Sequence, residues 1–376
     1  MPLETIQQVA KALQTKKHIL ITTRANPSGD CLASALAFYA LARKLKKKAA
    51  IAIDTSRFGL PERFSFLPEY ANIRTELSRE SDIVLEFDLN QDSLRGLTYD
   101  VRNHTLTVRV FPKEPGLTLG PVRQKNMAYP YDAIVVVDAC DLESLGSVYD
   151  EHTEFFYHTD IINIDHSSEN EHFGQINLVE MSAVATAEIL FTVAEHLGPE
   201  LIDPNLATCL LAGIVHESRS FQTNNITPKT LAIASELVSL GANRAEVMKQ
   251  LYYNKPVSSL RLWGKMLSNI QVDEAAQLAW VAVTKEDFES AHAGEKDLLD
   301  VLDDLLQHAP ESRAICIAYP GDEGFHAVVH THDPSLDLRR ALGRLGAFGS
   351  RNLVSCSISA RNGDEAIFAI KSLLTH

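Results

Sequence analysis

The sequence predicts an α/β protein, with a parallel-sheet domain, a smaller C-terminal α/β domain and a cleft between them. Over the first 250 residues, short apolar runs such as 133–137 (AIVVV) alternate with capped, amphipathic helical segments. A strand that is apolar at every position is typical of a parallel sheet buried on both faces. From about residue 271, strand-like segments separated by turns and closed by a helix predict the second domain.

The length and composition of the chain limit the classes of protein to which it can belong. A chain of 376 residues with 45% hydrophobic and 22% charged residues is usual for two globular domains. Five scattered cysteines without a CxxC pair indicate neither a disulfide framework nor a zinc knuckle. The net charge of −14 argues against binding of long duplex nucleic acid. No signal-peptide core and no run of membrane-spanning length is present, so we expect a cytoplasmic protein without a membrane partner.

The first strand and helix are predicted within residues 19–48. Residues 19–21 form an apolar run too short for a helix, and turn-forming residues follow at 26–29. A helical spacing of apolar side chains then leads to the basic run 43–48, where a helix C-terminus favours cations. Asp30 therefore stands at a strand-to-helix junction, either as a helix cap or as a ligand of a metal or cationic group.

The next elements are two further strands and an insertion. Residues 49–55 and 81–89 are predicted as buried strands that precede strand 133–137. Residues 94–111 have the two-residue period of strands on both sides of a turn at 102–104. This pattern predicts a β-hairpin inserted into the α/β order.

Helices dominate the rest of the first domain. After a strand at 161–164, one helix is expected from Ser182 to Gly198, and a mostly apolar helix runs into a polar loop at 216–218. A third helix begins with a capping threonine and ends at Gly241. The predicted organisation is a domain over residues 1–250, a helical linker over 251–270 and a C-terminal domain over 271–376.

Polar side chains follow several of these apolar segments. They are Asp30, Asp138, the pair Asp165 and His166, and Glu217. Because the carboxyl ends of parallel strands meet at one edge of a sheet, these groups are expected to lie together, with coincidence as the alternative. Carboxylates combined with imidazole suit Mn²⁺ or Mg²⁺ rather than zinc or copper.

Four stretches resemble the motifs of the DHH phosphoesterase family, particularly its short bacterial oligoribonuclease and nucleotide-phosphatase branch. They are residues 26–45 (NPSGDCLASALAFYALARKL), 135–141 (VVVDACD), 163–190 (NIDHSSENEHFGQINLVEMSAVATAEIL) and 213–242 (GIVHESRSFQTNNITPKTLAIASELVSLGA). The resemblance covers roughly residues 15–250, and the C-terminal hundred residues resemble the substrate-binding domain associated with that family. It implies hydrolysis of phosphate esters with two bridged metal ions, usually manganese, in the cleft between the domains.

The chain departs from the family pattern at metal ligands. Arg24 and Ser28 stand where the first motif of the family has a histidine and an aspartate, and Ser167 replaces the second histidine of the name motif. Asp138 matches the bridging aspartate, and Glu217 takes the place of the aspartate of the fourth motif. The resemblance therefore implies one metal site for a single Mn²⁺ or Mg²⁺ ion, formed by Asp30, Asp138, His166 and Glu217.

Arg24 has two interpretations. Its guanidinium is expected to lie beside Asp138 and Asp30, where it would replace part of the charge of the missing ion and pair the two carboxylates. The alternative is that Arg24 points to solvent.

The substrate-binding loop is also altered. The glycine-rich loop that ends in a phosphate-gripping histidine in the family is GAFGSRN (346–352) in this chain, without the histidine. Arg339 and Arg351 lie near it in sequence and are candidates to bind phosphate, although helix-surface arginines would look the same. Asn170, in the motif around the name sequence, is a further candidate for substrate binding.

Two hypotheses for the function follow. The first is a DHH-like metal-dependent phosphoesterase of short oligonucleotides or small phosphorylated nucleotides, with Asp138, His166 and Arg24 as catalytic residues and activity reduced by the incomplete first metal site. The second is a catalytically inactive module of the same fold that binds a nucleotide or a protein partner. A homodimer is compatible with both. The sequence has no Walker loop and no GxGxxG after a strand, which argues against a nucleoside triphosphatase or a nicotinamide enzyme.

Overall fold

The computed structural model describes residues 4–56, 59–77, 82–89, 94–113, 119–127, 129–254, 256–274, 277–295, 297–298, 302, 305, 312–321, 324–331, 333, 335–349 and 351–374. The chain divides into two compact units. One unit contains Met1–Leu77 and Tyr131–His376, and the other is the insertion Ser78–Pro130.

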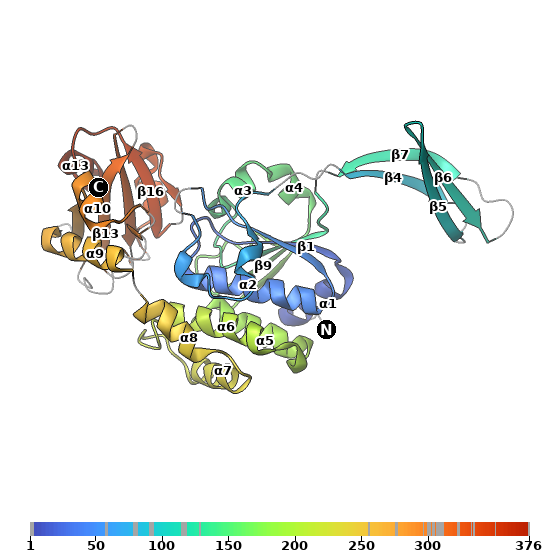
Figure 1. The fold of residues 1–376 in the computed structure, drawn as a ribbon, viewed down its shortest axis with the longest axis horizontal. Coiled ribbons are helices and arrows are strands. Elements are labelled where there is room, and N and C mark those ends of the chain that lie inside the picture. Colours follow the sequence, from blue (N-terminus) through green and yellow to red (C-terminus); the bar gives the residue numbers. More distant parts are fainter. Residues whose placement is uncertain are drawn as a thin grey trace. The chain divides into compact units, whose positions relative to one another are not determined.

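A six-stranded parallel sheet forms the centre of the N-terminal domain, in the order β10-β9-β8-β1-β2-β3 (Figure 1). Its strands are β1 (His18–Thr22), β2 (Lys48–Ala52), β3 (Ile73–Arg74), β8 (Ala133–Val137), β9 (Ile161–Asp165) and β10 (Ile176–Val179). Every residue of β8 and β9 is buried, as the uniformly apolar runs predict. The predicted α/β class is confirmed, and β1 and β8 are the neighbours between which the strand order reverses, where ligands bind in such sheets.

Helices cover both faces of this sheet (Figure 1). The helices of this domain are α1 (Thr5–Thr15), α2 (Gly29–Lys44), α3 (Ser147–Asp150), α4 (Thr153–His158), α5 (Thr186–Leu197), α6 (Pro204–Glu217), α7 (Pro228–Ser239) and α8 (Arg244–Met248), followed by a π-helical turn (Lys249–Tyr253). Helix α2 packs on β1 and β2 and also against α5 and α6, so it is buried almost all round. None of the helices in the described ranges is long and apolar enough to cross a membrane.

The prediction of a buried sheet strand at 81–89 is wrong for the part that the structure describes; residue 81 lies outside it. This segment forms β4, which pairs antiparallel with β7 in a ribbon of its own. In its sequence, DIVLEFDL, residues 83, 85, 87 and 89 are apolar and residues 82, 86 and 88 are acidic, a nearly two-residue period that suits a ribbon better than a strand covered on both faces. The third strand along the chain in the parallel sheet is the short β3 instead.

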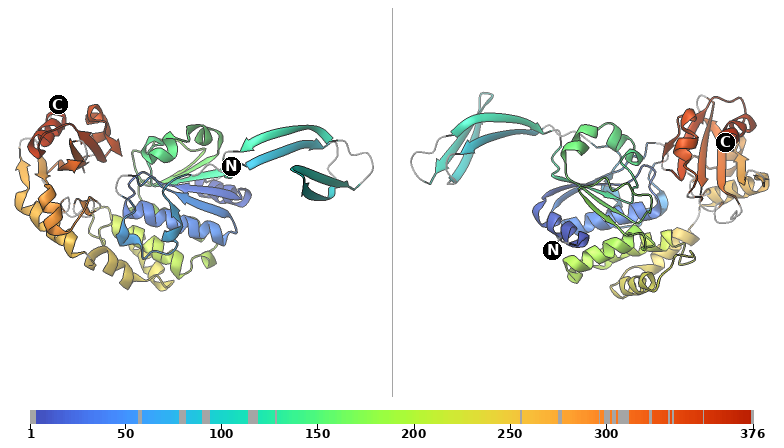
Figure 2. Two further views of the ribbon diagram at one scale, coloured as in Figure 1. Left: turned by 45° about the horizontal axis from the view of Figure 1, so that its top comes forward. Right: turned by 180° about the vertical axis from the view of Figure 1, so that it is seen from behind.

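The insertion also contains a hairpin where the sequence predicts one. Its two ribbons, both visible in Figure 2, consist of β4 (Asp82–Leu89) with β7 (Leu119–Met127), and β5 (Leu94–Arg102) with β6 (Thr105–Pro112). Asn103 and His104 connect β5 to β6 with φ values of 48° and 62°. Two successive residues with positive φ are the signature of a type I′ turn, which matches the twist of hairpin strands.

The C-terminal domain is built on a mixed sheet, in the order β11-β12-β13-β14-β16-β15 (Figure 2). Its elements are α9 (Val257–Asn269), β11 (Gln271–Asp273), β12 (Leu278–Ala282), α10 (Lys285–Ala291), β13 (Ala314–Gly321), β14 (Gly324–Thr331), α12 (Leu338–Ala341), β15 (Phe348–Gly349), β16 (Leu353–Ile358) and α13 (Gly363–Leu374). Ile315 and Ile317 of β13 enter one core and Cys316 enters another. The sheet is thus buried on both faces, which explains why β13 reads as continuously apolar.

Candidate metal centre

Asp30 enters the centre from the first turn of α2. Its fully buried carboxylate accepts hydrogen bonds from the backbone N–H groups of Thr186 (2.6 Å) and Ala187 (3.2 Å) and from Ser34 Oγ (2.9 Å). The two N–H groups belong to the first turn of α5, whose own N-cap, Ala185, has no capping side chain. Asp30 therefore caps α5 from another helix, and α5 begins at Thr186, later than the sequence predicts.

Asp138 follows β8 directly and has a left-handed backbone conformation, with φ at 56°. Its Oδ1 accepts a hydrogen bond from Thr186 Oγ1 (2.9 Å) and lies 3.4 Å from His166 Nε2. Its Oδ2 accepts a hydrogen bond from the Cys31 thiol at 2.7 Å. The two carboxylate oxygens of Asp138 thus face different neighbours.

Three of the predicted metal ligands meet. Asp30, Asp138 and His166 each offer one ligand atom, and these atoms all lie within 4.8 Å of one another. Two carboxylates and an imidazole are a donor set that fits a hard or borderline divalent ion such as Mn²⁺. The electrostatics also favour a bound cation, because two buried carboxylates this close repel each other unless a positive charge lies between them.

The protonation of these groups follows from burial and from one another. Burial and the charge of Asp138 raise the pKa of Asp30 to about 7. Burial alone would lower the pKa of His166, but the hydrogen bond and charge of Asp138 raise it to about 10. Burial likewise opposes ionisation of Asp138, and His166 and Arg24 overcome it and hold the pKa of Asp138 well below its usual range. Without a metal, the protonated imidazole of His166 therefore pairs with the ionised carboxylate of Asp138.

Glu217 is the last residue of α6 and is half-buried. It is not part of the group of ligand atoms within 4.8 Å that the described residues form. Its negative charge nevertheless reaches the centre, since it contributes to the raised pKa values of both His166 and Asp30 after the effects of burial and of Asp138.

Arg24 is half-buried and does not extend freely into solvent. Its Nε donates a hydrogen bond to Cys31 Sγ (3.0 Å), which in turn donates to Asp138, while Ser28 Oγ lies 3.1 Å from the same sulfur. The guanidinium, thiol and hydroxyl therefore gather on the Oδ2 side of Asp138, with His166 on the Oδ1 side. Sequence reasoning overlooked Cys31; its only signal was its position directly after Asp30.

Asn170 is buried within the motif loop rather than directed at open space. Its Nδ2 donates to Asp165 Oδ2 (2.7 Å) and to the Ala139 carbonyl (3.0 Å), and its Oδ1 accepts from Asn163 Nδ2 (2.7 Å). The other oxygen of Asp165 accepts the backbone N–H of His166 at 2.7 Å. Asn170 thus fixes Asp165, which orients the chain at His166.

Both candidate phosphate-binding arginines form ion pairs with motif loops of the N-terminal domain. Arg339 of α12 approaches both oxygens of Asp141, with the shorter contact 3.2 Å from Nη2 to Oδ2. Arg351 Nη1 lies 3.3 Å from Glu169 Oε1. Each arginine therefore pairs with a carboxylate three positions after a residue of the metal group, Asp141 after Asp138 and Glu169 after His166.

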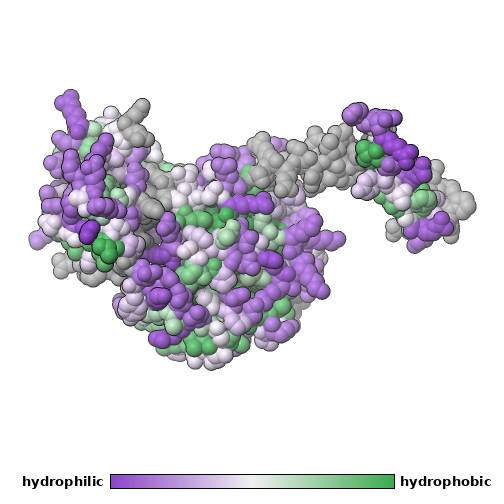
Figure 3. Space-filling model, viewed as in Figure 1, coloured by the Kyte–Doolittle hydropathy of each residue, from purple (hydrophilic) through white to green (hydrophobic). Residues whose placement is uncertain are grey.

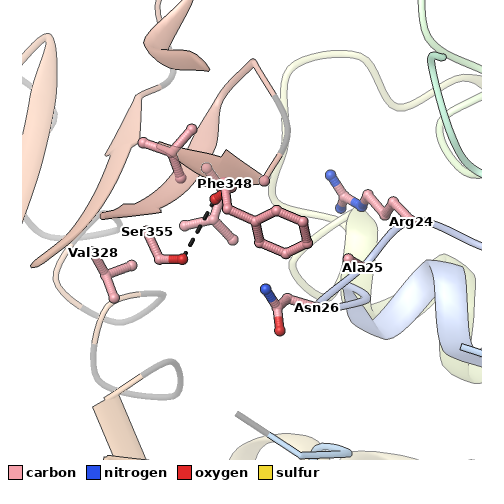
Figure 4. A pocket seen from close by; sticks show the side chains of 9 residues that line it. Arg24, Ala25, Asn26, Val328, Phe348 and Ser355 are labelled. Atoms are coloured by element: carbon pink, nitrogen blue, oxygen red, sulfur yellow. Dashed lines mark hydrogen bonds between the residues drawn. The ribbon is translucent and has the colours of Figure 1, made fainter. Parts of the chain in front are cut away.

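Phe348 occupies the middle of the altered glycine-rich loop. Figure 4 shows its ring pointing from β15 toward the loop that carries Arg24, Ala25 and Asn26. A side chain at Gly146 would place its Cβ only 2.7 Å from the ring, and the cavity left beside Arg24 measures about 10 Å³. That volume holds about one water molecule, so Phe348 nearly fills the space between β15 and the loop that carries Arg24.

Gly213 of α6 controls the space behind Asp30. A Cβ at this position would lie 2.5 Å from Asp30 Oδ1 and 2.7 Å from Ala187 Cβ. Gly213→Ala should therefore lower the free energy of unfolding by about 1–3 kcal/mol through overpacking and weaken Mn²⁺ binding by moving the carboxylate. Urea unfolding and titration calorimetry measure the two effects. Gly264→Ala in α9 is the matched control, because nothing lies within 4 Å of its Cβ; equal stability of the two variants would contradict the prediction.

The affinity for Mn²⁺ should rise with pH. Since the pKa of His166 is raised to about 10, the imidazole is protonated at neutral pH and an ion must displace its proton. Raising the pH toward that pKa removes the competition, so we expect the affinity to increase by roughly tenfold per pH unit. Calorimetry in buffers of different ionisation enthalpy measures both affinity and proton release; an affinity independent of pH would refute this coupling.

Comparisons with known proteins agree with this architecture. Residues 18–214 match the model of the DHH family, N-terminal domain. The chain is 27% identical over 265 residues to the bifunctional oligoribonuclease and PAP phosphatase NrnA of Thermus thermophilus, a match that spans 70% of this chain and 62% of that protein. It is 30% identical over 118 residues to the protein of the same name from Bacillus subtilis, spanning 30% of this chain and 37% of that one.

The matches thus span less than two thirds of these relatives. The fold has a full-length counterpart in the crystal structure of an exopolyphosphatase-related protein from Bacteroides fragilis, with a TM-score of 0.71 and 17% identity over 98% of this chain and 95% of that one. The family that the four motifs resemble is confirmed by the family model.

Proposed function

The chain belongs to the DHH family, and from that premise we propose that it is a metal-dependent phosphoesterase of short oligoribonucleotides or small phosphorylated nucleotides, with reduced activity. The observation that carries the proposal is the convergence of Asp30, Asp138 and His166 within 4.8 Å at the carboxyl end of the sheet. The substrate class is supported by the names of the relatives from Thermus thermophilus and Bacillus subtilis.

One divalent ion, Mn²⁺ or Mg²⁺, would be held by Asp30, Asp138 and His166, with Glu217 as a fourth ligand from the end of α6. A bound ion of this kind supplies Lewis-acid stabilisation of a phosphoryl oxygen and a water of lowered pKa. The protein fixes the geometry beforehand: the N-terminus of α5 holds Asp30, and Asp165 holds the backbone of His166. Such preorganisation is what makes an electrostatic site effective in catalysis.

Arg24 has a separate role in this proposal. Its guanidinium remains charged, because the neighbouring Cys31 and Asp138 raise its pKa further although burial opposes them. It can therefore stabilise negative charge that develops on a phosphate at the Oδ2 side of Asp138. Arg339 and Arg351 would bind further phosphate oxygens by exchanging their ion pairs with Asp141 and Glu169.

The proposed reduction in activity follows from the groups on the Oδ2 side of Asp138. Asp138, which matches the bridging aspartate of the family, accepts a hydrogen bond at Oδ2 from Cys31, and Cys31 is in turn hydrogen-bonded to Arg24. The first-motif positions that would supply ligands to the other ion are Arg24 and Ser28. This arrangement also favours a second candidate function, an inactive module that retains nucleotide in the cleft without hydrolysing it.

Metal-dependent hydrolysis tests the proposal. The purified full-length chain is titrated with MnCl₂ by calorimetry and assayed for phosphate release from PAP and for mononucleotide release from short oligoribonucleotides. We expect one ion per chain and slow hydrolysis that EDTA stops. Nucleotide binding without any hydrolysis would refute the enzyme and leave the binding module; two tight ions per chain would refute the single-ion site.

A further inference from the structure

The hairpin β5–β6 has one face made only of uncharged, mainly apolar side chains. Antiparallel pairing places three cross-strand pairs on it: Leu97 with Val110, Tyr99 with Val108, and Val101 with Leu106. The opposite face carries the polar residues Thr98, Asp100, Arg102, Thr105, Thr107 and Arg109, with the pair Gly96 and Phe111 at its far end. We refer to the first set as the apolar hairpin face.

This face is open in the single chain. Tyr99 is 74% exposed, Val101 63% and Leu97 58%, and the hairpin forms a two-stranded sheet of its own in the described part of the chain. Figure 3 shows hydrophobic residues at the surface of the described part of the insertion, beside hydrophilic ones. A two-stranded hairpin in water is marginally stable at best, and it gains stability when its apolar face packs on a second layer.

The side chains of the apolar hairpin face indicate which kind of partner it can bind. None of its six side chains is charged, so the face has no group that would pair with a phosphate or with a charged peptide. An uncharged apolar face can pack against a copy of itself around a two-fold axis without charge repulsion, which is the isologous arrangement. Two such hairpins stacked face to face would form a four-stranded sandwich with a closed core.

The size of the face is sufficient for this contact. Five of the six side chains are between 38% and 74% exposed. Side chains of this size expose on the order of 100 Å² each at such fractions. Pairing two copies would therefore bury about 1,000 Å² in total, the size at which a specific protein interface begins. We propose that the apolar hairpin face is a homodimerisation surface that packs against the same face of a second copy of this chain.

Oligomeric state tests this proposal directly. Sedimentation velocity and light scattering of the full-length chain should show a dimer at micromolar concentration. Val108→Asp places a carboxylate in the centre of the contact and should weaken dimerisation by at least about 100-fold, because the charge would be buried without a partner. The matched control is Thr107→Asp, the same side chain one residue away on the polar face, which should leave the dimer unchanged.

A crosslinking experiment locates the contact independently of stability. Tyr99→Cys, in the middle pair of the face, should form a disulfide-linked dimer on mild oxidation, whereas Thr107→Cys and the native chain should not. A monomeric native chain, or a dimer that Val108→Asp leaves intact, would overturn the proposal. A monomer that binds phospholipid vesicles through Tyr99 would overturn it as well and assign the face to a lipid surface.

Discussion

The double variant Arg24→His, Ser28→Asp should bind two Mn²⁺ ions per chain and hydrolyse PAP or a short oligoribonucleotide roughly a thousandfold faster than the native chain. The gain is expected because a second ion contributes several kcal/mol of electrostatic stabilisation to the transition state. The substitutions restore the histidine and aspartate of the family's first motif and remove the guanidinium beside Cys31. They leave the Cys31 thiol as the hydrogen-bond donor on the Oδ2 side of Asp138.

The local structure should tolerate both changes. Ser28 is the N-cap of α2, where its Oγ accepts the N–H of Cys31 at 3.2 Å. Aspartate is as good an N-cap as serine, so the helix keeps its first turn. Cys31 continues to donate to Asp138 until an ion displaces it.

Calorimetry gives the number of ions, and phosphate release gives the rate. Ser28→Asp alone is the control, since Arg24 would still lie beside Cys31. Ser167 and the missing loop histidine set an upper limit on the recovered rate. Brisk turnover by the native chain would show that a single ion is sufficient; a double variant that binds no metal would favour the inactive module.

Asp138→Asn should abolish detectable Mn²⁺ binding and all metal-dependent hydrolysis. Asp138 is the residue whose oxygens face both His166 and Cys31, and a neutral amide leaves the ion without its central anionic ligand. Asparagine is the appropriate replacement because Asp138 has φ at 56°, a conformation that asparagine adopts more readily than other side chains. An alanine variant would confuse loss of charge with backbone strain.

The matched control is Asp203→Asn, which makes the same exchange at the N-cap of α6. Asparagine caps helices as well as aspartate does, so this variant should keep native metal binding. Thermal unfolding should show both variants folded. Retention of Mn²⁺ binding by Asp138→Asn at native affinity would mean that the ion lies elsewhere in the chain.

The sequence by itself determined the class of fold and the positions of the chemical groups along the chain. The runs 133–137 and 161–164 are apolar at nearly every position, so they had to be buried strands, and Asp138 and His166 had to follow them. These are local properties, because strand type and strand end depend on residues within a few positions of each other. The motif order then identified the family without reference to any contact.

Tertiary packing alone decided how those groups are paired. Asp30 caps a helix 156 positions away, and Arg339 reaches Asp141 across 198. The segment 82–89 reads as a sheet strand but pairs with β7, because a strand-like run does not specify which other strand it pairs with. The role of Cys31 could be recognised only in the folded structure, where both Arg24 and Asp138 form hydrogen bonds with its sulfur. Such contacts depend on which surfaces pack together, and a linear pattern of apolar and polar residues does not contain that information.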